Sequence, residues 1–320
     1  MTRRSAIRLL ASSSAGFFYA KLRAAQQNKA STRIPQEFTI HAESRLVLLD
    51  VSVRDRSGRL VPGLSKDNFT VLEDGKRQEV TSFQAGDDPV TVGILVDESF
   101  SMAPKRPDVL TAAMTFIGSS NPEDEIFVIN FNDKVSYGLP PDVPFSDNIR
   151  QLSHALDLGE PEGKTRLYDA VLEGLRRVEL GRRRKKALLV ISDGGDNASE
   201  HTRAQMLSAV EDSLATIYSV GIFYPEDIDR DPHILRQIAR ISGGGSYFPE
   251  TVPATIPLCR GIAKEIRSRY TLGYIPQAGK GRGLIRHVQV IAEAQGMGKL
   301  TAHSRTSYRY VETSHDGAEQ

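Results

Sequence analysis

The sequence has 320 residues, which exceeds the usual size of one domain, so we expect two folded units. Its 41 lysines and arginines balance 40 aspartates and glutamates, and the net charge of +1 gives no reason to expect a nucleic-acid partner. The single cysteine, Cys259, excludes an internal disulfide. We expect it to be a buried thiol in an amphipathic helix over residues 256–266.

Residues 1–25 resemble a bacterial twin-arginine export signal. Arg3 and Arg4 precede a mildly apolar stretch, residues 9–20, that is too short and too polar to span a membrane. Ala6 stands where that motif usually has a bulky residue, and a clean Ala-x-Ala cleavage pattern is missing. The alternative is an unstructured basic tail. We expect an exported protein, in the periplasm or outside the cell, with no transmembrane span in the mature chain.

Residues 38–88 predict a small antiparallel unit. Apolar and polar side chains alternate along 47–54, which is the period of a strand with one solvated face. Further strands are expected at 69–72 and 80–83, with turns at 56–59 and 74–75.

Residues 90–268 alternate strand and helix patterns and predict one α/β domain. Parallel strands need helical crossovers, so we expect a doubly wound, mostly parallel sheet with helices on both faces. The expected strands are 91–97, 125–131, 187–192, 215–222 and 246–249, and the expected helices are 104–118, 146–157, 166–179, 202–213, 232–241 and 254–267.

Strand patterns return in residues 269–312, at 270–275, 287–291 and 299–310. A sheet of two or three strands is marginal alone, and the amino-terminal strands are the available partners. We therefore expect the α/β domain to be inserted in a small antiparallel β-sandwich built from both chain ends. Residues 313–320 are expected to form a disordered tail.

Hard oxygen donors follow the apolar run 92–96. Asp97, Ser99 and Ser101 place one carboxylate and two hydroxyls at the end of a buried strand, where α/β proteins bind ligands. Mg²⁺ accepts such a sparse set because it prefers oxygen ligands and usually retains waters. The same residue types are also ordinary turn and capping residues, so these three alone are weak support for a metal site.

Two later residues complete a recognisable pattern. Thr165 begins an expected helix, and Asp193 ends a second buried strand. Together, Asp97, Ser99, Ser101, Thr165 and Asp193 resemble the metal-ion-dependent adhesion site of von Willebrand factor type A (VWA) domains. The segments 61–69, 72–75 and 270–274 also look like those of exported VWA-related proteins of acidobacteria.

The resemblance implies a protein-binding, non-enzymatic adhesion or scaffold role. It implies Mg²⁺, with Mn²⁺ as the other candidate, and a protein partner whose Asp or Glu carboxylate completes the coordination of the metal.

Two alternatives stay open. Residues 159–165 nearly spell a nucleotide-binding P-loop, which would make the protein an ATPase that uses Lys164 and Asp193. That loop is one residue short, carries Glu160 and Glu162 where phosphate would sit, and follows an expected helix instead of a strand. The second alternative is a metal-independent structural protein of the envelope. The basic run 182–186 is expected to be a solvated loop.

Overall fold

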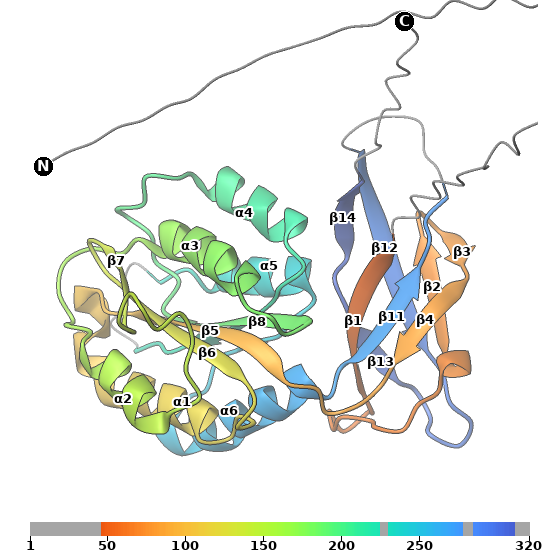
Figure 1. Ribbon diagram of the computed structural model, residues 1–320, viewed down its shortest axis with the longest axis horizontal. Coiled ribbons are helices and arrows are strands. Elements are labelled where there is room, and N and C mark those ends of the chain that lie inside the picture. The colour runs from red at the N-terminus through yellow and green to blue at the C-terminus, as the bar shows by residue number, and fades with distance from the viewer. Residues whose placement is uncertain (1–45, 225–229, 278–283, 311–320) are drawn as a thin grey trace, which may run out of the picture. The chain divides into compact units, whose positions relative to one another are not determined.

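The computed structural model describes residues 46–224, 230–277 and 284–310, and these contain three β-sheets (Figure 1). All of them fall within one unit of the chain, residues 44–320. The expected export signal, 1–25, and the expected tail, 313–320, lie outside the described residues. Within the described part of the chain, no helix is long and apolar enough to cross a membrane.

A six-stranded sheet forms the centre of the α/β domain, in the order β10-β9-β8-β5-β6-β7. Its pairings are parallel except for that of β7, which is antiparallel to β6. The strands are Val90–Asp97 (β5), Glu125–Phe131 (β6), Val135–Tyr137 (β7), Lys185–Ser192 (β8), Thr216–Gly221 (β9) and Ser246–Tyr247 (β10). This arrangement confirms the expected doubly wound sheet.

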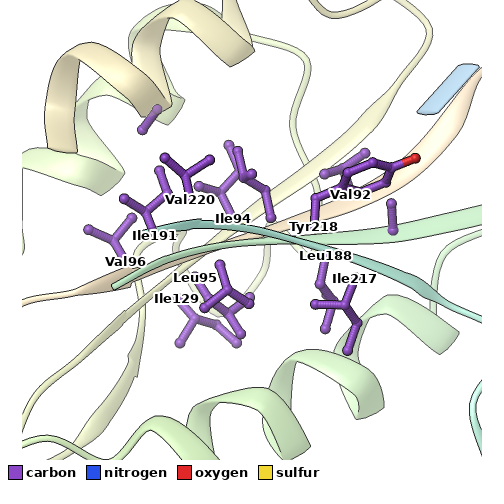
Figure 2. Packing of buried hydrophobic residues seen from close by; sticks show 14 of the residues in the cluster. Val92, Ile94, Leu95, Val96, Ile129, Leu188, Ile191, Ile217, Tyr218 and Val220 are labelled. Atoms are coloured by element: carbon purple, nitrogen blue, oxygen red, sulfur yellow. The ribbon is translucent and has the colours of Figure 1, made fainter. Parts of the chain in front are cut away.

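Helices cover both faces of this sheet (Figure 1). One face carries Leu167–Glu179 (α3), Arg203–Asp212 (α4) and Pro232–Ser242 (α5), and the other carries Arg106–Ile117 (α1), Ile149–Asp157 (α2) and Val252–Arg267 (α6). Every residue of β5 is buried, as expected for a strand covered on both sides. Figure 2 shows Ile94 and Val96 on one face of this strand and Leu95 on the other.

Strands from both ends of the chain form the β-sandwich. Its two sheets have the orders β13-β1-β11-β4 and β14-β12-β2-β3, and every pairing in them is antiparallel. Each sheet mixes strands from before and after the α/β domain, which confirms the expected insertion. The strands are Val47–Arg54 (β1), Phe69–Glu73 (β2), Lys76–Gln78 (β3), Val80–Gln84 (β4), Tyr270–Tyr274 (β11), Leu284–Ala292 (β12), Thr301–His303 (β13) and Ser307–Tyr310 (β14).

The two ends of the α/β domain lie next to each other. The main-chain N–H of Asp88 donates to the carbonyl oxygen of Arg267 (3.5 Å), and the Arg267 side chain donates to Asp87 (2.8 Å). The inserted domain therefore begins and ends at adjacent points.

The basic run 182–186 differs in part from the expected solvated loop. Arg182 is exposed and contacts Glu125, as a loop residue can. Lys185 begins β8 and is buried. Its ammonium group donates to the carbonyl oxygens of Arg267 (2.5 Å) and Arg269 (2.9 Å). Cys259 is a free, fully buried thiol, as expected.

A second buried cation, Arg269, joins β11 to residues from four other segments. Its guanidinium donates to the carbonyl oxygens of Asp50 (2.6 Å), Gly243 (2.8 Å) and His303 (3.1 Å). It also donates to the hydroxyl of Tyr218 (2.8 Å). One side chain thus satisfies acceptors from both the sandwich and the α/β domain.

We predict that Arg269→Leu lowers the free energy of unfolding by about 3–5 kcal/mol, because several buried acceptors lose a charged donor at once. Urea unfolding followed by far-UV circular dichroism measures this. Arg182→Leu is the matched control, since its side chain is 91% exposed and exposed ion pairs contribute little. Equal stability of the two variants would contradict the role assigned to Arg269.

Candidate metal-binding site

The candidate site lies where the strand order of the central sheet reverses. From β5 the chain adds β6 on one side, then crosses back to place β8 on the other side of β5. Asp97 is the last residue of β5, and Asp193 directly follows β8. Crevices at such reversal points, outside the carboxyl ends of the strands, are the usual ligand sites of open α/β sheets.

A tight turn after β5 positions Ser99 and Ser101 beyond the end of the strand. The Asp97 carboxylate accepts a hydrogen bond from the main-chain N–H of Ser99 (2.9 Å). Ser99 directly precedes the 3₁₀ helix Phe100–Lys105 (η2), and its carbonyl oxygen accepts from the N–H of Met102 (2.9 Å). The hydroxyl oxygens of Ser99 and Ser101 lie 3.2 Å apart.

These serines connect to the second strand end. The Ser101 hydroxyl donates to Oδ2 of Asp193 (2.7 Å), while Oδ1 of Asp193 accepts from the N–H of Gly195 (3.1 Å). Gly194 has a φ of +86°, and a Cβ there would lie 2.2 Å from the carbonyl oxygen of Asp231. Only glycine fits this turn.

Hydrogen bonds of its main chain fix Thr165 in its loop. Its N–H donates to the Asn197 side chain (2.9 Å), and its carbonyl oxygen accepts from the N–H groups of Asn197 (3.1 Å) and Ala198 (3.0 Å). The N–H of Phe100 donates to the carbonyl oxygen of Gly163 (3.1 Å), which ties the loop of Thr165 to the serine turn.

The structure thus links three of the five predicted residues, Ser99, Ser101 and Asp193, in one chain of side-chain hydrogen bonds. Asp97 joins them through the Ser99 main chain and through its charge interaction with Asp193. Thr165 is buried on the neighbouring loop and is connected through main-chain contacts.

Two carboxylates are buried together here, since Asp97 and Asp193 are each 1% exposed. Burial, and next the charge of Asp193, raise the pKa of Asp97 to about 7, although hydrogen bonds from Ser192 (2.6 Å) and Ser99 oppose the shift. An unfolded aspartate has a pKa of about 3.9. Asp97 therefore stabilises the metal-free fold at low pH, and that contribution is lost as the pH rises from about 4 to about 7.

Lys105, at the end of η2, supplies a positive charge to the same site. Its side chain is fully buried, and its Nζ lies 3.2 Å from Oδ2 of Asp193, the oxygen that Ser101 also contacts. The ammonium group further contacts the Met102 sulfur (3.7 Å) and lies 5.9 Å from the centre of the Tyr224 ring. The ammonium group of Lys105 is therefore the positive charge next to the carboxylate of Asp193.

The donor chemistry of the five residues fits a hard divalent cation. They offer two carboxylates and three hydroxyls, all oxygen ligands of the kind that Mg²⁺ takes. Among the described residues there is no group of three or more His, Cys, Asp or Glu side chains placed to hold a metal. A metal at this site would therefore depend on the hydroxyls as well as on the two aspartates.

Three residues of the site escaped the sequence analysis. Ser192 directly precedes Asp193 and was readable as a further hydroxyl at the same strand end. Asn197 lies four residues past Asp193, in a run of turn residues that carries no specific signal. Lys105 falls in the expected helix 104–118, where a lysine normally indicates a solvated face.

The loop that resembles a P-loop is held by other contacts. Helix α2 precedes it, as expected, instead of the strand that a P-loop follows. Lys164 is exposed, and its main-chain N–H donates to Asp133 (3.0 Å). Glu160 and Glu162 are also exposed, so the loop itself carries negative charge.

One comparison with known proteins matches part of the α/β domain to a family. Residues 92–195 match the family model of the von Willebrand factor type A domain, which confirms the resemblance for that segment. The segment contains all five predicted site residues. Similarity to exported proteins of acidobacteria stays a prediction. A search of the curated proteins finds no match.

The search of solved structures finds matches at low sequence identity. The von Willebrand factor type A protein from Catenulispora acidiphila is 14% identical, with a TM-score of 0.50, and the match covers 84% of this chain and 74% of that one. BatB from Bacteroides thetaiotaomicron is 17% identical, with a TM-score of 0.46, over 56% of this chain and 100% of that one. The corresponding domain of the type V pili tip protein Mfa5 from Porphyromonas gingivalis is 11% identical, with a TM-score of 0.46, over 62% and 99%.

We predict that Lys105→Met destabilises the protein in chelator by about 3–5 kcal/mol, because a buried carboxylate loses its cation. Added Mg²⁺ should raise the melting temperature of this variant more than that of the wild type, since the carboxylates then attract a cation more strongly. Lys164→Met, which removes an exposed lysine from a neighbouring loop, should change neither quantity. Melting curves in chelator and in Mg²⁺ provide the measurement. This prediction assumes that Lys105 and the metal compete for the carboxylate of Asp193. A response to Mg²⁺ in Lys105→Met equal to that of the wild type would contradict it.

Proposed function

We propose that the protein binds a partner protein through a divalent cation held by Asp97, Ser99, Ser101, Thr165 and Asp193. The observation that carries this proposal is the chain of hydrogen bonds from Ser99 through Ser101 to Asp193, at the reversal point of the sheet. The match to the von Willebrand factor type A family supports a protein-interaction role.

The partner in this proposal supplies an Asp or Glu carboxylate. Mg²⁺, or Mn²⁺ in its place, keeps octahedral coordination and retains waters when a protein offers few ligands. A bound cation would act as an electrophile there, and an incoming carboxylate would replace a water and neutralise charge. Asp97 and Asp193 would hold the cation, and the three hydroxyls would supply neutral oxygens that leave it electrophilic.

The proposed setting is outside the cytoplasm, and its support is the amino-terminal sequence with Arg3 and Arg4. A non-enzymatic role is part of the same proposal. The match to a von Willebrand factor type A domain is in keeping with it.

We predict that Asp97→Ala weakens Mg²⁺ binding at least about a hundredfold, or about 2.7 kcal/mol, because one of the two carboxylates of the site is removed. Isothermal titration calorimetry measures the affinity, and circular dichroism checks that the fold persists. Glu162→Gln is the matched control, since it removes an exposed acid from the loop that leads to Thr165. Wild-type affinity in Asp97→Ala would refute the metal assignment.

Capture of a carboxylate is tested with displayed peptides that carry one fixed aspartate. The wild type should enrich them in Mg²⁺ and lose them in chelator, and an Asp193→Ala variant should enrich none. Ca²⁺ should substitute poorly, because it prefers more ligands and longer bonds. Equal enrichment in chelator would leave a metal-independent interaction protein as the better description.

The ATPase alternative makes a separate prediction about Lys164. We expect the wild type to bind no ATP in equilibrium dialysis, and Lys164→Ala to keep the Mg²⁺ affinity of the wild type, because this side chain is exposed. Saturable ATP binding that disappears in Lys164→Ala would reverse the ranking of the two functions.

A further inference from the structure

We propose that Phe100 is a specificity-determining contact residue, and that the partner places an apolar side chain next to the carboxylate that reaches the cation. The inference rests on the proposed function and deepens it, because it names the partner chemistry beside the metal. Three observations about Phe100 carry it: its exposure, its position and the way its main chain is fixed.

Phe100 is the most exposed large apolar side chain in the described part of the chain. Its exposed fraction is 74%, and Leu180 follows with 65%. The ring therefore adds little to the core of the α/β domain, and replacing it should leave the fold intact. Single exposed apolar residues are common on protein surfaces, so exposure alone assigns no role.

The second observation is the position of Phe100 in the sequence of the candidate site. It lies between Ser99 and Ser101, whose hydroxyls form the chain that ends on Asp193. Consecutive Cα atoms are about 3.8 Å apart, and a phenylalanine side chain reaches further than that. The proposal places this ring against a partner protein whose carboxylate meets a cation held by Ser99 and Ser101.

The main chain around the ring is held before any partner arrives. The N–H of Phe100 donates to the carbonyl oxygen of Gly163 (3.1 Å), and the N–H of Ser99 donates to the Asp97 carboxylate (2.9 Å). An aromatic side chain on a fixed main chain loses little freedom on binding, which is why such residues dominate many protein interfaces. Burial of an exposed ring favours an apolar neighbour on the partner.

The test compares three proteins as selection targets, namely the wild type, Phe100→Ala and Leu180→Ala. Leu180 is the matched control because it is another highly exposed apolar residue. It lies between α3 and the start of β8, at the amino ends of the strands and away from Ser99 and Ser101. The probe is a displayed library of nine-residue peptides with a fixed central aspartate and random flanks, selected in Mg²⁺ and in chelator.

We expect the wild type and Leu180→Ala to enrich apolar residues next to the fixed aspartate, in Mg²⁺ only. Phe100→Ala should still enrich aspartate peptides, but without an apolar preference. A soluble peptide chosen on the wild type should bind Phe100→Ala about tenfold more weakly, while calorimetry with Mg²⁺ alone gives the same affinity for both proteins.

The outcomes separate this inference from the function on which it rests. Mg²⁺-dependent enrichment without an apolar preference in the wild type, or with the same preference in Phe100→Ala, overturns the inference and leaves carboxylate capture standing. Weaker Mg²⁺ binding by Phe100→Ala shows a structural role for the ring and also overturns it. No Mg²⁺-dependent enrichment on the wild type overturns the proposed function and the inference together.

Discussion

Two carboxylates buried at one edge of a parallel sheet require a proton or a positive charge beside them. Asp97 and Asp193 are placed in this way by the ends of β5 and β8, and the structure meets the requirement twice. Burial raises the pKa of Asp97, so that it can hold a proton near neutral pH, and Lys105 contacts Asp193. A divalent cation at this site would replace both the proton of Asp97 and the ammonium group of Lys105. Binding of such a cation would therefore be linked to the protonation of Asp97 and to the contact of Lys105.

Buried cations also organise the opposite end of the sheet. Lys185 and Arg269 donate to carbonyl oxygens where the chain passes between the α/β domain and the sandwich strands. Because Lys185 begins β8 and pairs in register with Val90 at the start of β5, these contacts lie at the amino ends of the strands. The candidate site lies at the carboxyl ends of the same strands. Buried charged side chains therefore lie at both ends of these parallel strands.

Long apolar runs made most of the fold predictable. The fully buried strand β5 follows from a continuous apolar run, and helix α3 from the helical spacing of its apolar residues. By contrast, β3 and β7, with three residues each, are too short to show a pattern. The alternation in 299–310 is split between β13 and β14, which belong to different sheets, and only pairing partners far along the chain decide this. Lys105 was unpredictable for the same reason, because its partner Asp193 is 88 residues away. The metal, the partner and export stay predictions.

The insertion of one domain in another has a consequence for how the chain can fold. The side chains of Asp50 and Thr271 meet across β1 and β11 although 221 positions separate them, and such distant pairing normally slows folding. A folded α/β domain shortens the loop that must close before β1 and β11 can pair, because it already holds the two flanking segments together. The hydrogen bond between Asp88 and Arg267 marks this junction. The residues of the α/β domain are also synthesised before β11. The sandwich therefore cannot close on the ribosome until the whole α/β domain has been made.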